Sequence, residues 1–321
     1  MLKAYHRGPS GLICLTDPAE VGDGALWIDL FDPVPSEREA VRRLLGLDPP
    51  TKAEMAEIEA SSRLYVEDGA MVMTAGVLVY AESERPVVTP VTFILKGECL
   101  VTLRHHDPLP FRTFVPRLDR SGSTIGLAVL LGLLEAVVDR SADILERSMS
   151  DLDELTEQVF SNKAVNPLKK FDLNAVLKRI GQVGDRVSKL RESLSGLSRL
   201  MLFLAQAMEE TKPSKDIRAR LKTLQRDVKS LTDQDSFVTA RISFLLDATL
   251  GLISIEQNAI IKIFSVAATA FLPPTLIASI YGMNFHHMPE LDWKLGYPIA
   301  IMLMVLSAIL PLWYFRRRGW L

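Results

Sequence analysis

The chain has 321 residues, of which 48% are hydrophobic, and its formal net charge is −2. This near-neutral charge disfavours nucleic acid as a partner. The sequence contains no P-loop, nucleophile elbow or HExxH motif, which disfavours an ATP-driven pump or a hydrolase, so we expect neither an enzyme nor a cofactor. Its two cysteines, Cys14 and Cys99, lie far apart in strand-like runs and are predicted to be inert, buried thiols rather than a disulfide or a metal pair.

Residues 1–116 are predicted to form a mixed α/β domain. Residues 25–30 read as a short strand, followed by a helix over 36–47 with Ser36 as its N-cap and Glu39 as its capping-box partner. Residues 51–60 repeat this pattern with Thr51 and Glu54. Two hairpins are expected to follow, with turns at Asp68-Gly69 and at Lys96-Gly97-Glu98.

Long helices are predicted after residue 116. Apolar residues recur at helical spacing over 125–160, 167–210 and 214–281, with few helix-breaking residues inside these segments. The last helix would be about 100 Å long at 1.5 Å per residue. Residues 117–258 are therefore predicted to form a stalk of long helices.

Two charge-free apolar stretches close the sequence, at 263–283 and 295–315, each 21 residues long. A helix needs about 20 such residues to span a bilayer. We predict a first transmembrane helix at 259–283, an external loop at 284–294, a second transmembrane helix at 295–315 and a basic tail at 316–321. Because the tail carries Arg316, Arg317 and Arg318 and no signal peptide is visible, both termini are expected in the cytoplasm. The expected fold class is a helical membrane protein with an α+β cytoplasmic domain, long stalk helices and two C-terminal transmembrane helices.

One face of the last stalk helix carries polar and small residues at alternating spacings of three and four. Such a period keeps a single face toward a common axis. Polar groups at membrane depth face a water-filled path or other protein, and small residues also permit tight helix packing, so a pore lining and a packing seam both fit this pattern. The positions are Asp247, Gly251, Ser254, Asn258, Ile261, Ser265, Ala268, Leu272, Thr275 and Ser279, which we call the α-stripe.

The sequence resembles the CorA magnesium and cobalt transporters along its whole length. The resemblance is most specific at the outer end of the first apolar stretch, in Tyr281-Gly282-Met283-Asn284-Phe285. Other matching segments are Trp27–Leu30, Ile58–Ser61, Ile255–Asn258, Ile260–Val266, Phe271–Leu276, Met288–Leu291 and Trp320-Leu321. Within that family the chain is most similar to the enterobacterial branch.

This resemblance implies a homopentamer in the inner membrane that conducts Mg²⁺ passively, with Co²⁺ and Ni²⁺ as further cargo. Gly282, Met283 and Asn284 would form the outer mouth of a central pore, with the Asn284 amide oxygens in a ring. Ser279, Thr275, Leu272 and Asn258 would line the path, with Leu272 as an apolar constriction and Asp247 as an acidic ring at the cytoplasmic entrance. Neutral oxygens suit Mg²⁺, which gives up its water reluctantly, because they can bind the hydration shell without stripping it.

Three departures from the family pattern leave alternatives open. An aspartate that one branch uses for a regulatory metal falls on Thr223, and Asp227, one turn later, is a possible substitute. His286-His287 replaces an acidic-aromatic pair, and imidazole favours softer metals such as Zn²⁺ or Ni²⁺. Ser279 stands where relatives carry glycine. The alternatives are a Zn²⁺ transporter of the related ZntB branch and a non-conducting, membrane-anchored metal sensor.

Overall fold

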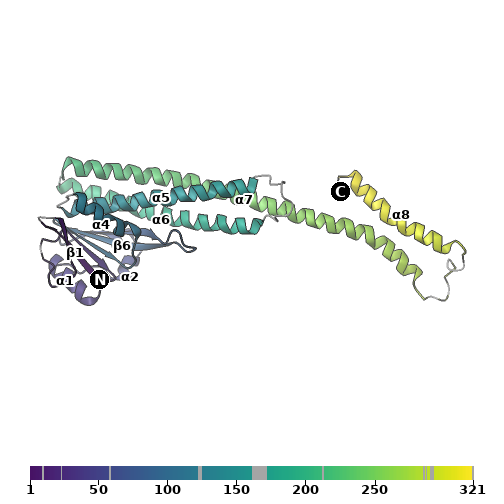
Figure 1. The fold of residues 1–321 in the computed structure, drawn as a ribbon, viewed down its shortest axis with the longest axis horizontal. Helices are drawn as coiled ribbons and strands as arrows, with labels where there is room; N and C mark the ends of the chain where they lie inside the picture. The colour runs from purple at the N-terminus through teal and green to yellow at the C-terminus, as the bar shows by residue number, and fades with distance from the viewer. Residues whose placement is uncertain are drawn as a thin grey trace. The chain divides into compact units, whose positions relative to one another are not determined.

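The computed structural model describes the chain except residues 9–10, 23, 58, 122–124, 161–171, 212, 285, 287, 290–292 and 320–321. Parts of four motifs named above (Phe285, His287, Glu290-Leu291 and Trp320-Leu321), together with Ile58, lie outside the described residues. The chain divides into two compact units, Met1–Leu246 and Asp247–Leu321. The predicted fold class is confirmed: an N-terminal α/β unit, long helices and two apolar C-terminal helices (Figure 1).

The N-terminal unit is built on a seven-stranded sheet in the order β2-β1-β3-β7-β6-β5-β4. Only the β3–β7 pair is parallel among the described strands, and this central pair is almost entirely buried. Parallel strands are normally covered on both faces, which is the case here. The strands are β1 (Leu2–Gly8), β2 (Gly11–Leu15), β3 (Trp27–Phe31), β4 (Leu64–Glu67), β5 (Ala70–Val79), β6 (Val87–Lys96) and β7 (Cys99–Arg104).

One face of the sheet packs against the short helices α1 (Pro35–Leu45), α2 (Lys52–Ala56) and α3 (Ala60–Arg63). Its core is apolar and includes Ile28, Leu30, Val41, Met55 and Val101. The predicted capping box of α2 is confirmed, since the Thr51 hydroxyl accepts from the Glu54 amide and the Glu54 carboxylate accepts from the Thr51 amide. The helix nevertheless ends at Ala56 rather than at residue 60.

The predicted start of α1 is wrong by two residues. The N-cap is Val34 and not Ser36, and Glu37 rather than Glu39 accepts the hydrogen bond from the N-cap amide, at 3.0 Å. The reason is Pro35, whose fixed φ and missing N–H suit the first helical position. The Glu37 carboxylate also accepts from the Met1 ammonium at 2.8 Å, which ties α1 to the start of β1.

Both predicted hairpins are confirmed, with turns between β4 and β5 and between β6 and β7. Asp68 and Gly69 both adopt positive φ, as a tight two-residue hairpin turn requires. The predicted strand at 25–30 lies at Trp27–Phe31. Cys14 is exposed, contrary to expectation, because its side chain lies on an edge strand. Cys99 is partly covered, and burial raises the pKa of its thiol to about 11, as expected of an inert thiol.

The other face of the sheet is covered by α4 (Leu109–Ser121), α5 (Gly126–Phe160) and α6 (Leu173–Thr211). The α5 N-terminus approaches the β6–β7 turn so closely that a Cβ at Gly126 would lie 2.6 Å from the Glu98 carbonyl oxygen. Ser193 on α6 donates to the Gly76 carbonyl in β5 at 2.7 Å. The domain boundary predicted at residue 116 falls inside α4, and α5 and α6 pack directly on the sheet.

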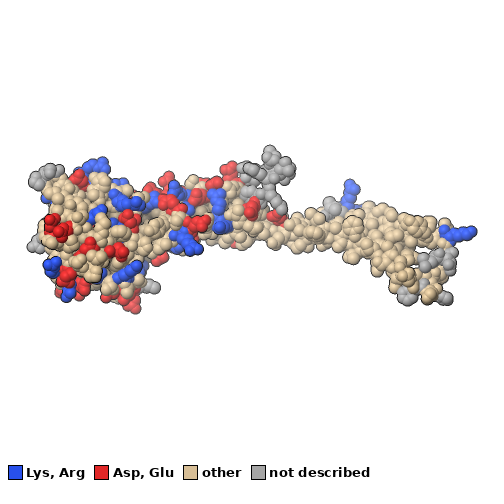
Figure 2. Space-filling view, turned by 60° about the horizontal axis from the view of Figure 1, so that its bottom comes forward, with Lys and Arg blue, Asp and Glu red and all other residues tan. Residues whose placement is uncertain are grey.

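The 67-residue helix α7 (Lys215–Tyr281) has the extent that its apolar spacing predicts. Within the N-terminal unit, ion pairs join it to α5 and α6: Arg220 to Glu135 at 2.8 Å, Arg241 to Asp153 at 2.6 Å and Arg191 to Asp235 at 2.5 Å. In the C-terminal unit α7 continues to the turn at Gly282, and α8 (Gly296–Arg317) follows. Charged side chains of both signs cover the N-terminal unit and are nearly absent from the C-terminal unit (Figure 2).

Candidate functional site

Both helices of the C-terminal unit contain an apolar window long enough to cross a membrane. Only 6% of each window is buried inside the structure, unlike the core helix of a soluble protein. Large apolar side chains such as Phe264, Phe271 and Leu276 are more than 60% exposed. This surface therefore has to be covered by lipid, by other protein chains or by both.

Every residue of the α-stripe is exposed. Exposure alone does not distinguish the stripe, since about half of the other residues between 247 and 281 are exposed as well. The chemistry of the stripe is more distinctive in the apolar stretch 263–281. There Ser265, Thr275 and Ser279 place hydroxyl groups on one face, and the positions off the stripe are apolar apart from Thr269 and Tyr281. A helix of this kind can face lipid on one side and a polar path or a partner helix on the other.

Two prolines interrupt the hydrogen bonding of α7 close to the outer part of the stripe. Pro273 and Pro274 have no N–H, so neither can donate to a carbonyl of the preceding turn. Thr275 follows directly, and its hydroxyl donates to the carbonyl oxygens of Phe271 and Leu272 at 3.0 and 2.9 Å. Because its hydrogen is used inside the helix, the Thr275 hydroxyl presents acceptor lone pairs to its surroundings.

The helix α7 ends at the glycine-methionine-asparagine turn. The Gly282 amide donates to the Ala278 carbonyl at 2.9 Å, and the Met283 amide donates to the Ile280 carbonyl at 3.3 Å. A Cβ at Gly282 would lie only 3.1 Å from the Ala278 oxygen, so a larger residue there would force the turn to shift. Met283 and Asn284 are exposed beyond the last turn.

Basic residues gather at the opposite end of the C-terminal helix pair. Lys262 on α7 donates to the Gly319 carbonyl at 3.3 Å. The guanidinium of Arg317 stacks on Trp313 at 4.2 Å and that of Arg318 on Tyr314 at 5.6 Å. Cations and aromatic rings at one end of apolar helices are typical of a membrane–water interface.

The acidic candidates of the N-terminal unit do not form a metal site within one chain. No group of three or more His, Cys, Asp or Glu side chains suited to a metal occurs in the described part of the chain. Asp227 is exposed on α7, and so is Asp247, the first residue of the C-terminal unit. Three acidic side chains of α5 form ion pairs with arginines: Asp151 with Arg186, Asp153 with Arg241 and Glu154 with Arg179.

The histidines that follow β7 are also engaged. His105 Nδ1 lies 2.9 Å from the Asp32 carboxylate, and His106 Nδ1 lies 2.8 Å from the Thr89 hydroxyl. The neighbouring Asp107 pairs with Arg104 and Arg112.

A buried carboxylate that the sequence-based predictions do not include lies between α6 and α7. Asp235 is 0% exposed, and its Oδ1 atom has no hydrogen-bond partner in the described structure. Burial raises the pKa of this carboxyl above its usual value of 3.8, and the partly exposed Arg191 opposes that shift only in part. The surrounding apolar spacing, from Leu231 to Val238, was the available signal, because it places residue 235 on the buried face.

This pKa gives a testable pH dependence. A carboxyl whose pKa is raised by folding stabilises the fold fully below its unfolded pKa, and this contribution is lost as pH rises through the folded pKa. Asp235→Asn cannot titrate. We therefore expect the melting temperature of the wild type to fall relative to Asp235→Asn as pH rises above about 4. Melting curves of both proteins over a pH series measure this, and a constant difference would contradict the assignment.

Comparison with known proteins agrees with these features. The family model described as "CorA-like Mg2+ transporter protein" matches residues 22–317. The magnesium transport protein CorA of Pasteurella multocida (strain Pm70) is 36% identical over 302 residues, which cover 93% of each chain. That of Escherichia coli (strain K12) is 34% identical over 299 residues, or 92% of each chain. The complete structure of the CorA magnesium transporter from Methanocaldococcus jannaschii is similar in fold, with a TM-score of 0.74, 20% identity and coverage of 100% of this chain and 99% of that one.

Proposed function

Because the chain belongs to the family of CorA-like Mg²⁺ transporter proteins, we propose that it is a passive Mg²⁺ channel of the inner membrane, with Co²⁺ and Ni²⁺ as further cargo. The observation that carries the proposal is the α-stripe, which leads along α7 to the exposed Gly282-Met283-Asn284 turn. No nucleotide-binding motif is present in the sequence, so the membrane potential drives the ion. That potential is worth about 2.3 kcal/mol per elementary charge per 100 mV, and twice as much for a dication.

The pore is formed by five copies of the chain around one axis. A single α7 offers one polar face, and a pore needs several such faces directed at each other. The remaining exposed apolar side chains of α7 and α8 contact neighbouring copies and lipid. Both termini lie in the cytoplasm, in keeping with the basic residues Lys262 and Arg316–Arg318 at one end of the helix pair.

The stripe suits a hydrated ion. The waters around Mg²⁺ point their hydrogens outward, so a path for the hydrated ion needs hydrogen-bond acceptors. The Asn284 amide oxygen is one, and the Thr275 hydroxyl, whose hydrogen is used by the helix backbone, is another. Leu272 forms an apolar constriction, where an ion with its waters passes only when the pore widens.

Uptake into liposomes tests the proposal. The purified chain is reconstituted with a Mg²⁺-sensitive dye inside, and uptake is driven by a negative internal potential. We expect saturable Mg²⁺ uptake that Co²⁺ and Ni²⁺ inhibit. Absence of uptake of any divalent cation by folded, reconstituted protein would favour the membrane-anchored sensor, and uptake of Zn²⁺ in preference to Mg²⁺ would favour the ZntB-type function.

Leucine at either of two stripe positions is expected to block conduction. Thr275→Leu and Ser279→Leu each remove a polar group and narrow the path, which should reduce Mg²⁺ uptake at least about tenfold, the effect of roughly 1.4 kcal/mol on a barrier. The matched controls Thr275→Ser and Ser279→Thr keep a hydroxyl and should conduct. Normal uptake by both leucine variants would place the path elsewhere and leave the stripe as a packing seam.

Cytoplasmic Mg²⁺ is proposed to close the channel by bridging carboxylates of neighbouring copies, with Asp227 as a ligand. Facing carboxylates repel each other when empty and are held together by a dication, so the ion favours the closed assembly. Millimolar Mg²⁺ should protect the N-terminal unit from protease in the wild type and less in Asp227→Ala. Asp233→Ala, exposed on a different face of α7, is the control and should behave like the wild type. Equal protection in all three proteins would rule out Asp227.

A further inference from the structure

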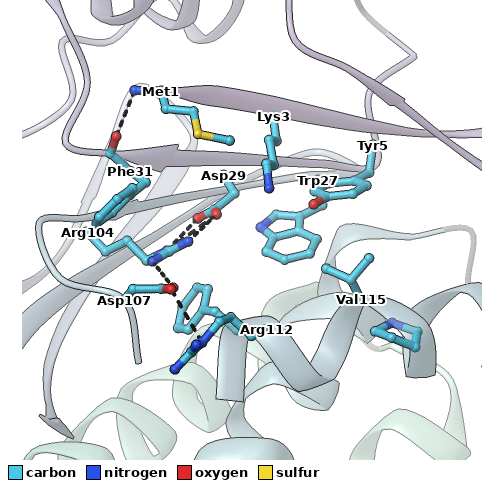
Figure 3. A pocket seen from close by; sticks show the side chains of 12 residues that line it. Met1, Lys3, Tyr5, Trp27, Asp29, Phe31, Arg104, Asp107, Arg112 and Val115 are labelled. Carbon is cyan, nitrogen blue, oxygen red and sulfur yellow. Dashed lines mark hydrogen bonds and ion pairs between the residues drawn. The ribbon is translucent and has the colours of Figure 1, made fainter. Parts of the chain in front are cut away.

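A cavity of about 500 Å³ lies in the N-terminal unit between the sheet and α4, away from every residue assigned to conduction (Figure 3). Its walls come from β1, β3, β7 and α4. Strand register places the lining side chains on one face of the sheet, since Lys3 is opposite Asp29 and Tyr5 is opposite Trp27. The volume lies within the range of sites for small molecules.

An ion pair with several additional hydrogen bonds forms one end of this cavity. Arg104 contacts both carboxylate oxygens of Asp29 at 2.8 to 3.3 Å and also Asp107 at 2.7 Å. Its guanidinium lies between the rings of Phe31 and Phe111, at 4.7 and 4.9 Å. Asp29 additionally accepts from the Thr102 hydroxyl at 2.8 Å. Because these carboxylates are already neutralised and hydrogen-bonded, they do not offer a site for a metal cation.

Lys3 also lines the cavity, and no described carboxylate neutralises its positive charge. Its ammonium has no ion-pair or hydrogen-bond partner in the described structure, and Figure 3 shows it directed toward the space beside Asp29 and Trp27. Arg112, on α4, reaches the same space and makes one ion pair, with Asp107 at 3.4 Å, while its side chain is 63% exposed. The lining therefore holds three cationic side chains against two carboxylates, and it attracts an anion.

The wall beside Lys3 is apolar. Trp27 is 1% exposed and stacks on Tyr5, with ring centroids 4.7 Å apart and planes 16° apart. Its indole N–H is bonded to Thr102 at 2.9 Å, so the ring is held in place. Val115 on α4 completes this side of the cavity. Trp27 therefore supports the wall from behind, and the apolar surface that faces the space comes from the partly exposed Val115 and the exposed Pro116 on α4. An apolar surface beside an unpaired cation suits an organic anion with an apolar body.

We propose that this cavity binds a small organic anion with an apolar body, whose anionic group contacts Lys3 and Arg112 and whose apolar body lies along Val115 and Pro116. An inorganic anion would leave the apolar wall without a contact, and a neutral apolar molecule would leave Lys3 unpaired. This assignment is independent of the proposed conduction, because none of these residues belongs to the α-stripe or to the turn at Gly282.

Phenyl phosphate is the probe, used with the full-length chain in detergent. Titration calorimetry should give saturable binding to the wild type. It should give at least about tenfold weaker binding to Lys3→Gln and to Arg112→Gln, since each variant removes a charge-assisted hydrogen bond to the anionic group. The matched control is Arg117→Gln, on the same helix but paired with Asp139 outside the cavity, and it should bind like the wild type.

Fluorescence locates the bound probe. Trp293→Phe, Trp313→Phe and Trp320→Phe together leave Trp27 as the only one of four tryptophans. Its emission should change saturably with phenyl phosphate and not with phenol. No binding by the wild type, equal affinity in Lys3→Gln and the wild type, or inorganic phosphate binding as tightly as phenyl phosphate would each overturn the proposal. Mg²⁺ uptake into liposomes is measured separately, so failure here leaves the conduction assignment standing.

Discussion

Asn284→Ala is expected to abolish Mg²⁺ uptake into liposomes while leaving the oligomer assembled. Asn284 is exposed beyond the last turn of α7, so its side chain makes no core contact whose loss would unfold the chain. In the proposed channel its amide oxygens accept hydrogen bonds from the hydration shell of the entering ion. Alanine removes this acceptor from every copy in the oligomer, so the entering ion loses all of these hydrogen bonds together.

The measurement pairs dye-reported uptake with the mass of the detergent-solubilised oligomer. His286→Ala, two residues further along the loop, is the control for general disturbance and should retain uptake with Mg²⁺ as the preferred ion. A changed order of metals in His286→Ala would instead favour a role for imidazole in choosing softer cations. Near-normal uptake by Asn284→Ala would remove the glycine-methionine-asparagine turn from the proposed path.

Arg104→Met is expected to produce the largest loss of stability in the N-terminal unit. Asp29 and Arg104 have side chains only 6% and 9% exposed. Removing the arginine leaves a buried carboxylate without its counter-ion, and such a loss costs about 3–5 kcal/mol. The guanidinium also fills the space between Phe31 and Phe111, so its removal disturbs the packing of α4 on the sheet.

Thermal unfolding followed by circular dichroism measures this effect. The control is Arg117→Met, which breaks an exposed pair with Asp139 and should cost about 0–1 kcal/mol. The double variant Asp29→Leu with Arg104→Met should recover part of the loss, since a buried ion pair can be replaced by apolar groups at little cost. Equal melting temperatures for Arg104→Met and Arg117→Met would contradict the prediction.

Sequence patterns over a few neighbouring residues are enough to predict those helices and turns whose determinants lie close together in the chain. Asp68-Gly69 specifies a tight hairpin because both residues tolerate positive φ, and Thr51 with Glu54 specifies the start of α2. The apolar spacing after Pro213 predicts α7 to within one residue at its start, because a long helix repeats the same signal many times. The charge-free stretches at 263–283 and 295–315 likewise indicate membrane helices by length and composition alone.

Tertiary structure decided the features that depend on partners distant in the sequence. Asp29 and Arg104 are 75 residues apart, and only the parallel pairing of β3 with β7 brings them together. The burial of Asp235 depends on α6 packing against α7, and the Lys3 cavity depends on α4 covering one face of the sheet. The same limit applies to the α-stripe. The spacing and polarity of the stripe are properties of the sequence. Whether the stripe faces an ion or a neighbouring helix depends on the assembly of several chains, because a single helix cannot enclose a path.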